Sequence, residues 1–242
     1  MTQDDADAFG RLPVRQVREL SVKPMARTRW PATLAPVRQL LDDGLDLGAI
    51  TVLVGDNGAG KSTMVEAIAA VYGLNPEGGS TSSRYQSRVD ESGLAEHLQL
   101  VRNGGASKRG FFLRAETMHG FFTYLESIGD SGVFHERSHG ESFLDIVVER
   151  SRISGLWILD EPESALSFSG CLALIGILKD LVASGKSQVI LSTHSPVLAA
   201  FPGAVIHEVG DWGLRRSEWA DLDLVRNLSL FLDAPGRFLR HV

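Results

Sequence analysis

The sequence predicts an α/β fold in which helices flank a parallel or mixed β-sheet, and three observations support this class. Strand-like and helix-like segments alternate along most of the 242 residues, as they do in α/β domains. A glycine-rich stretch, GDNGAGKST, stands between an apolar run and a helix-forming run. A later apolar run ends in the adjacent carboxylates Asp160 and Glu161. Open α/β sheets bind ligands at such strand ends, so the pattern predicts a binding site together with the fold.

The first half of the chain leads into and out of the glycine-rich stretch. Residues 50–54 (ITVLV) are apolar and β-branched, which favours a buried strand. The run at 64–71 favours a helix. Residues 75–92 are rich in Gly and Ser and predict a surface loop. The other elements expected here are a strand at 14–22 and a short helix at 36–41.

The second half continues the alternation. Residues 111–114 and 156–159 are apolar runs of strand length, whereas 141–150 carries its apolar side chains on one helical face. The remaining expected elements are strands at 94–101 and 189–191, helices at 117–127, 172–182 and 222–232, and a terminal hairpin at 204–209 and 214–216.

Size, charge and cysteine content describe a single compact domain. A chain of 242 residues can bury one sizeable core. Its apolar runs are strand-sized and its first ten residues lack an apolar signal segment, so we expect a cytoplasmic protein without a membrane segment. The formal net charge of −6 supplies no global basic field for nucleic acid. Cys171 sits among Leu and Ile, which predicts a buried helix residue.

The glycine-rich stretch fits the phosphate-binding pattern G-x-x-x-x-G-K-[ST] at every fixed position. Its glycines let backbone N–H groups surround phosphate oxygens, and the following helix adds partial positive charge at its N-terminus. Lys61 would reach the β- and γ-phosphates, and the Ser62 hydroxyl would bind Mg²⁺. The stretch therefore predicts a nucleoside triphosphate site. Its expected nucleotide-binding residues are Gly55, Asp56, Asn57, Gly58, Ala59, Gly60, Lys61, Ser62 and Thr63.

The acidic strand end predicts a metal ligand and a catalytic group. Asp160 would hold Mg²⁺, directly or through water, beside the Ser62 hydroxyl. Glu161 would polarise the water that attacks the γ-phosphate. Glu163, two residues further on, is expected to cap the following helix.

Two further segments carry candidate phosphate contacts. His194 follows an apolar strand in LSTHSP and would hydrogen-bond the γ-phosphate.

The segment Ser138 to Glu141 directly precedes a helix. Ser138 or His139 could cap that helix, or the free N–H groups could form a phosphate surface used in trans, against nucleotide held by another subunit. Its distance upstream of the acidic strand favours the second interpretation.

Taken in order, these motifs resemble those of the ATP-binding-cassette (ABC) class of ATPases. GDNGAGKST is similar to the Walker A motif, and LWILDEPE to the Walker B strand with its glutamate. SHGES stands at the place of the LSGGQ-type signature, SALS at that of the D-loop, and STHSP at that of the switch histidine. Within the class, the motif sequences resemble those of small stand-alone bacterial "AAA family" ATPases. These are related to the head domains of recombination-repair and chromosome-structure ATPases.

The resemblance implies a P-loop NTPase fold of ABC type, with a mixed central sheet, flanking helices and a small helical lobe. It implies one ATPase domain over residues 1–242, with the helical signature lobe at about 73–150. It also implies the cofactors ATP and Mg²⁺, with Glu161 and His194 as the catalytic residues. The partner it implies is a second copy in an ATP-dependent homodimer. There Ser138 and Gly140 would contact the γ-phosphate held by the other subunit, within a signature that includes His139 and Glu141.

The chain departs from the family pattern at several places. Its signature lacks the paired glycines and final glutamine of transporter subunits, and Glu116 stands where the Q-loop glutamine is expected. Trp30 is the available aromatic for adenine stacking, with a packed core tryptophan as the alternative. The chain between Walker A and the signature is too short for the long coiled coil of chromosome-type heads.

Three uses of such an ATPase remain open from the sequence. The first is a stand-alone dimerisation switch in a DNA-linked process, although the net charge does not indicate nucleic acid. The second is the ATP-binding subunit of an ABC transporter, and the third is a non-hydrolysing nucleotide sensor. The sequence identifies no protein partner.

Overall fold

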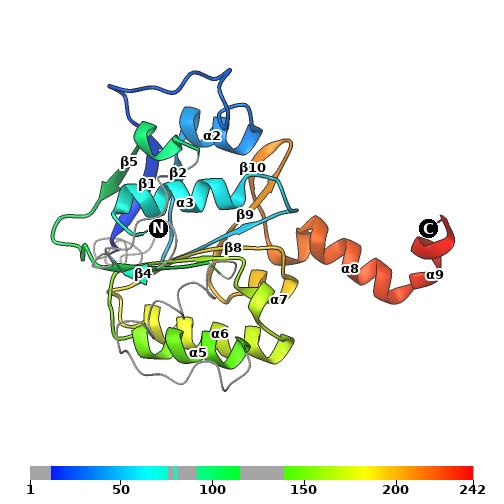
Figure 1. The fold of residues 1–242 in the computed structure, drawn as a ribbon. Helices are drawn as coiled ribbons and strands as arrows, with labels where there is room; N and C mark the ends of the chain where they lie inside the picture. The colour runs from blue at the N-terminus through cyan, green and yellow to red at the C-terminus, as the bar shows by residue number, and fades with distance from the viewer. Residues whose placement is uncertain (1–11, 76–78, 81–91, 115–138, 242) are drawn as a thin grey trace, which may run out of the picture.

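The computed structural model describes residues 12–75, 79–80, 92–114 and 139–241. Over these residues a seven-stranded sheet separates two layers of helices, and a three-stranded sheet lies on the side of one layer (Figure 1). The α/β class with a mixed central sheet, predicted from the sequence, is therefore confirmed.

The central sheet has the strand order β10-β9-β3-β8-β7-β6-β4. Its strands are β3 (Ile50–Val54), β4 (Gly79–Ser80), β6 (Gly110–Arg114), β7 (Leu156–Asp160), β8 (Gln188–Thr193), β9 (Val205–Gly210) and β10 (Gly213–Arg216). Neighbours from β9 to β6 pair in parallel, while the edge strands β4 and β10 are antiparallel to their neighbours. The parallel strands therefore end at one edge of the sheet, where the loops after β3, β7 and β8 meet.

A smaller antiparallel sheet has the order β2-β1-β5. It contains β1 (Val14–Glu19), β2 (Leu45–Asp46) and β5 (Leu98–Arg102). The buried amide of Gln188, at the start of β8, joins this sheet to the central one. Its Oε1 accepts a hydrogen bond from the Val14 N–H at 3.0 Å, and its Nε2 donates to the carbonyls of Val14 and Gly48 at 2.6 and 2.9 Å. The two sheets are thus hydrogen-bonded through one side chain.

Helices cover both faces of the central sheet. The α-helices are α2 (Ala35–Asp43), α3 (Lys61–Tyr72), α5 (His139–Arg150), α6 (Phe168–Ala183), α7 (Pro196–Ala199), α8 (Asp223–Asp233) and α9 (Pro235–Phe238). Short 3₁₀ turns are η1 (Leu94–His97), η4 (Pro162–Ala165), η5 (Trp219–Asp221) and η6 (Leu239–His241). In Figure 1, α2 and α3 lie on one side of the sheet and α5 and α6 on the other. Within the described ranges, no helix combines the length and the apolar character needed to cross a bilayer.

The hydrophobic core has two halves, one on each face of the central sheet. Successive side chains of a strand point to opposite faces. On β7, Trp157 therefore packs in the half that contains the helices α5 and α6, whereas Ile158 packs in the half that contains α3. Both strands β7 and β8 are buried at every residue, as expected for parallel strands covered on both faces.

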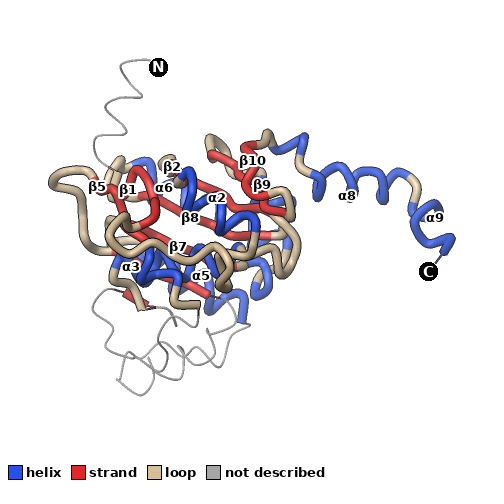
Figure 2. The backbone as a smooth tube through the Cα atoms, turned by 90° about the horizontal axis from the view of Figure 1, so that it is seen from above, coloured by secondary structure: helices blue, strands red, loops and turns tan. Residues whose placement is uncertain are grey.

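The chain ends in an arm formed by α8, α9 and η6, residues 223–241, which we call the C-terminal arm. It extends away from the body in both views (Figures 1 and 2). Only its first turn is packed into the core, where Val225 is 8% exposed. Further along, Leu230 and Leu232 are 56% and 68% exposed.

Several local expectations differ from the structure. The first four residues of the strand expected at 94–101 form the turn η1, since Gly93 has a φ of 64° and the Ser92 hydroxyl accepts from the Leu94 N–H at 3.1 Å. The strand expected at 14–22 stops at Glu19, because the chain turns there and the Lys23 N–H donates to a carbonyl. The edge strand β4 was not predicted. The helix expected at 117–127 lies outside the described residues. Among those described, the region 73–150 contains β4, η1, β5, β6 and α5.

Candidate nucleotide-binding site

The glycine-rich stretch forms a tight loop between β3 and α3. A Cβ atom at Gly55 would lie 2.3 Å from the carbonyl oxygen of Val209, so no larger side chain fits this turn. Gly60 has a φ of 96°, a left-handed conformation that glycine adopts without strain. No side chain caps the N-terminus of α3, which begins at Lys61. The first amides of this helix are therefore available to an anion.

Lys61 is buried beneath this loop, with 2% of its side chain exposed. Its Nζ donates to the carbonyls of Gly55 and Asp56 at 2.7 and 2.9 Å. It also lies 3.2 Å from Oε1 of Glu161 at the end of β7. The lysine of the loop and the second carboxylate of the acidic strand thus meet.

Asp160 ends β7 beneath the start of α3. Its Oδ1 accepts hydrogen bonds from the Ser62 hydroxyl at 3.1 Å and from the Ser192 hydroxyl, and its Oδ2 lies 3.6 Å from Nε of Arg114. Burial raises the pKa of Asp160, while the Ser192 and Ser62 hydroxyls and the Arg114 charge act in the opposite direction. Hard oxygen ligands suit Mg²⁺, and two neighbouring ligands of an octahedral ion lie about 2.9 Å apart. The oxygens of Ser62 and Asp160 therefore fit the ion that the sequence predicts.

Glu161 has an unusual backbone conformation. Its φ of 47° and ψ of 51° place it in the left-handed region, and among the described residues it is the only non-glycine with a positive φ. Its N–H donates to the carbonyl of Ser192 at 3.1 Å, which continues the pairing of β7 with β8. Strained residues of this kind gather at functional sites, where the surrounding structure holds them in place.

His194 follows β8 and faces two carboxylates. Its Nδ1 lies 3.3 Å from Oε1 of Glu163 and 3.8 Å from Oε2 of Glu161. The same Glu163 oxygen accepts from the His194 N–H and the Thr193 hydroxyl, each at 2.6 Å. Glu163 therefore ties the end of β8 to the loop after β7.

The expectation that Glu163 caps the following helix was wrong. Ser167 is the N-cap of α6, and its hydroxyl accepts from the Gly170 N–H at 3.2 Å. Glu163 lies in the turn η4, which faces β8 instead. Cys171, in the first turns of α6, is buried as predicted, and burial raises the pKa of its thiol.

The signature segment lies at the start of α5, with His139, Gly140 and Glu141 in its first turn. A Cβ atom at Gly140 would lie 3.0 Å from the carbonyl oxygen of Ala165, so the helix closely approaches the turn that follows Glu161. Ser138 and the Q-loop candidate Glu116 lie outside the described residues.

Trp30 lies in the segment before α2 and is 52% exposed, which excludes the packed core alternative. Leu34, four residues later, would be 3.2 Å from a Cβ atom at Gly60, so this segment reaches the phosphate loop. Adenine stacking on Trp30 stays a prediction.

Residues that sequence reasoning missed also converge here. Arg114 ends β6, lies 2.5 Å from Oε1 of Glu66 on α3 and faces Asp160. Ser192 and Thr193 end β8 and contact Asp160 and Glu163. A polar residue that ends an apolar strand was the signal used for Asp160, and it would have identified Arg114 as well.

Comparison with known proteins found similar sequences. Residues 42–117 match a family model described as an AAA domain. The chain is 26% identical over 189 residues to the xylose import ATP-binding protein XylG of Pseudomonas syringae pv. tomato, covering 65% of this chain and 36% of the relative. It is 27% identical over 179 residues to the cytochrome c biogenesis ATP-binding export protein CcmA of Rhodopseudomonas palustris. This match covers 64% of this chain and 84% of the relative.

A similar fold occurs among solved structures. One chain, from a structure described as an inward-facing metal-chelate type ABC transporter, aligns with a TM-score of 0.50 and 17% identity, covering 91% of this chain and 89% of that one. The chain spans 36% of the length of the xylose import protein above, and 38% of the length of another relative, the ribose import ATP-binding protein RbsA 2 of Agrobacterium fabrum.

Proposed function

We propose that the chain is a P-loop ATPase of the ATP-binding-cassette class, which hydrolyses ATP to ADP and phosphate as a nucleotide-dependent dimer. The observation that carries the proposal is the meeting of three groups at one edge of the sheet. Lys61 lies 3.2 Å from Glu161, Ser62 lies 3.1 Å from Asp160, and His194 lies 3.8 Å from Glu161.

Phosphate binding uses the loop and the start of α3. The uncapped amides of α3 and the partial positive charge of its N-terminus attract the phosphate oxygens. Lys61 exchanges its contacts with the loop carbonyls and with Glu161 for contacts with the β- and γ-phosphates. The arrival of nucleotide therefore releases the Glu161 carboxylate from its ion pair.

Metal binding uses Ser62 and Asp160. Mg²⁺ supplies neutralisation of the charge that develops on the phosphates. The Asp160 carboxylate is held in place by Ser192 and by the nearby Arg114, so it is already oriented toward Ser62. Ionised Asp160 is disfavoured by its burial, and a divalent cation beside it offsets that penalty.

Water activation falls to Glu161. Once separated from Lys61, its carboxylate accepts a proton from the water that attacks the γ-phosphate, or orients that water. His194 donates a hydrogen bond to the γ-phosphate, and Glu163 fixes the backbone of His194 through the 2.6 Å contact with its N–H. Because ATP carries a γ-phosphate and ADP does not, a residue that contacts this group distinguishes the two nucleotides.

The position of the signature segment supports the dimer. The start of α5, with Gly140 beside the Ala165 carbonyl, presents helix amides that serve a phosphate held by another subunit. A two-fold axis supplies both composite sites at once. Ser138, His139, Gly140 and Glu141 are the trans residues in this proposal. Binding of ATP then joins the subunits, and hydrolysis separates them.

Substitution of Glu161 by Gln tests the hydrolytic step. The variant keeps the shape of the side chain but loses the base, so we expect kcat to fall at least about 100-fold while ATP still binds. The matched control is Glu149→Gln, at an exposed glutamate on α5, which should retain wild-type turnover. Wild-type turnover in Glu161→Gln would remove Glu161 from the mechanism. A wild-type chain that binds ATP and never releases phosphate would instead be a nucleotide sensor.

Subunit complementation tests the composite site. Lys61→Ala disables the phosphate loop, and Ser138→Arg disables the signature, so each variant alone should be inactive. A mixed dimer keeps one intact site, made from the loop of one subunit and the signature of the other. Random co-assembly should therefore restore about one quarter of wild-type activity. Activity that stays at the level of the single variants would contradict a site built in trans.

A second function, the ATP-binding subunit of an ABC transporter, is favoured by the relatives, which are import and export ATP-binding proteins. The signature without paired glycines disfavours it. Co-purification with a membrane protein would select this function. A DNA mobility shift that weakens steeply with salt would instead select the DNA-linked switch.

A further inference from the structure

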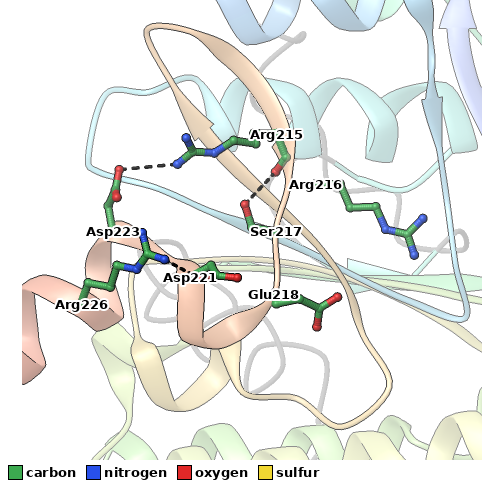
Figure 3. A pocket seen from close by; sticks show the side chains of 7 residues that line it. All are labelled: Arg215, Arg216, Ser217, Glu218, Asp221, Asp223 and Arg226. Carbon is green, nitrogen blue, oxygen red and sulfur yellow. Dashed lines mark hydrogen bonds and ion pairs between the residues drawn. The ribbon is translucent and has the colours of Figure 1, made fainter.

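The charged pocket at the root of the C-terminal arm balances its own charges. Three arginines and three acidic residues line it, so its formal charge is zero. Arg226 pairs with Asp221 at 2.5 Å, and Arg215 is directed toward Asp223, 3.6 Å away (Figure 3). Both aspartates of this pocket therefore have a partner within the chain.

The loop at the end of β8 differs from this pocket, because two buried polar atoms there lack a partner. Within the described part of the chain, Oε2 of Glu163 and Nδ1 of His194 have no hydrogen bond. The two side chains already touch, since Nδ1 lies 3.3 Å from Oε1 of the same carboxylate. Unsatisfied buried atoms are rare in folded proteins because each one costs free energy, so a pair of them at a site requires a physical explanation.

The nearer carboxylate oxygen is already in use. Oε1 of Glu163 accepts from the His194 N–H and from the Thr193 hydroxyl, each at 2.6 Å. These two donors occupy the lone pairs of that oxygen, whereas Oε2 keeps both of its own. The last torsion of a glutamate side chain is soft. A small turn of the carboxylate or of the imidazole therefore pairs Nδ1 with Oε2 and satisfies both atoms.

Two carboxylates compete for the imidazole of His194. Its Nδ1 is buried although 43% of the side chain is exposed, so the ring turns its Nδ1 edge inward and its other side, with Nε2, outward. Oε2 of Glu161 lies 3.8 Å from Nδ1, compared with 3.3 Å for Glu163. A ring paired with Glu161 would occupy the carboxylate that is proposed to activate water, whereas a ring paired with Glu163 leaves it free.

We propose that Glu163 is a positioning residue that accepts a hydrogen bond from Nδ1 of His194, draws the ring away from Glu161 and presents Nε2 to the γ-phosphate. The inference rests on the proposed contact between His194 and the γ-phosphate. A carboxylate bonded to one ring nitrogen fixes the protonation and the orientation of the other. A ring that donates at both nitrogens is an imidazolium, so this arrangement also places positive charge beside the phosphate.

Long-range ¹H–¹⁵N NMR of the histidine rings tests the pairing on the full chain without nucleotide, with the His194 signals assigned from their loss in His194→Gln. We expect a proton on Nδ1 in the wild type. In Glu163→Gln the amide oxygen stays with the His194 N–H and the Thr193 hydroxyl. The amide nitrogen cannot accept, so Nδ1 should become unprotonated. A wild-type ring protonated only on Nε2 would overturn the proposal.

Calorimetry with two Mg²⁺-bound nucleotides tests the consequence for the γ-phosphate. AMP-PNP carries a non-hydrolysable γ-phosphoryl group and ADP has none. Glu163→Gln should weaken AMP-PNP binding about tenfold, the lower end of what loss of such an outer contact costs. ADP affinity should stay at the wild-type value, which also shows that the phosphate loop is intact. A wild-type ratio of the two affinities in Glu163→Gln would contradict the positioning role.

A double-mutant cycle separates positioning from general loop stability. In the His194→Gln background, Glu163→Gln should cost no further AMP-PNP affinity, because its effect passes through the ring; a second loss of equal size would make Glu163 merely structural.

The control for a different partner of Oε2 is Cys171→Ala. Burial and then the charge of Glu163 raise the pKa of the Cys171 thiol, so this thiol lies near the carboxylate. The control should keep the wild-type ratio of affinities, and a changed ratio would make the thiol the partner of Oε2. If His194→Gln alone leaves the ratio unchanged, the proposed γ-phosphate contact fails, and the NMR result still decides the pairing.

Discussion

The left-handed backbone of Glu161 predicts a reversal of the usual stability order of alanine and glycine. An L-residue in this region is strained by about 1–2 kcal/mol, and glycine relieves that strain. Against this, glycine loses about 0.5–1 kcal/mol relative to alanine through the greater freedom of the unfolded chain. At a φ of 47° the difference favours glycine. The free energy of unfolding of Glu161→Gly should therefore exceed that of Glu161→Ala by about 0.5–1 kcal/mol. Both variants lose the ion pair to Lys61.

Urea denaturation of the nucleotide-free variants measures this difference, and thermal unfolding should show it as about 1–3 °C in Tm. Both variants lack the carboxylate proposed to activate water, so neither should turn over ATP. The paired control is Glu149, an exposed position within α5. There the free energy of unfolding of the alanine variant should exceed that of the glycine variant by about 1 kcal/mol. If alanine is as stable as glycine at position 161, the strain argument is refuted.

Three further predictions concern groups around the site. Glu163→Ala removes the acceptor of two part-buried donors, the Thr193 hydroxyl and the His194 N–H, so urea denaturation should show a loss of about 2–4 kcal/mol. Glu163→Gln keeps one acceptor oxygen for the His194 N–H and should lose less than half of that, and equal losses would contradict this role. Trp30→Ala should weaken ATP binding about tenfold by calorimetry and Trp30→Phe far less, and unchanged affinity in both would exclude stacking. The hydrogen bond from Arg27 lowers the pKa of Glu19, so Glu19 stabilises the fold above its ordinary value of 4.5 and loses that contribution as pH falls through its lowered pKa. The stability gap between wild type and Glu19→Gln should then close in acid, and a gap that persists there would contradict the linkage.

Much of the fold could be predicted because its central strands contain runs of consecutive apolar residues. A buried parallel strand must be apolar on both faces, so β3, β7 and β8 are visible as short runs bounded by polar residues. The boundaries of such runs also located Asp160 and His194. The convergence of these residues follows from topology, because parallel neighbours end at one edge.

Other features could not be predicted because they depend on contacts distant in sequence. The edge strand β4 has two residues and exists only by pairing with β6. Glu163 resembles a helix cap in sequence, but its acceptors are used by residues about thirty positions later. The exposure of the C-terminal arm could not be predicted either. A helix with one apolar face has the same sequence pattern whether its partner is the body or another chain.

The amide of Gln188 has a mechanical consequence for the whole molecule. It acts in place of a peptide group, and its three hydrogen bonds lie inside the core, where no water can replace them. Strand β8 cannot slide along its axis without breaking all three. The strand that ends at the candidate site at one tip and holds the small sheet at the other therefore moves only with both sheets together. The two sheets behave as one mechanical unit, in which slippage between strands is opposed from inside the core.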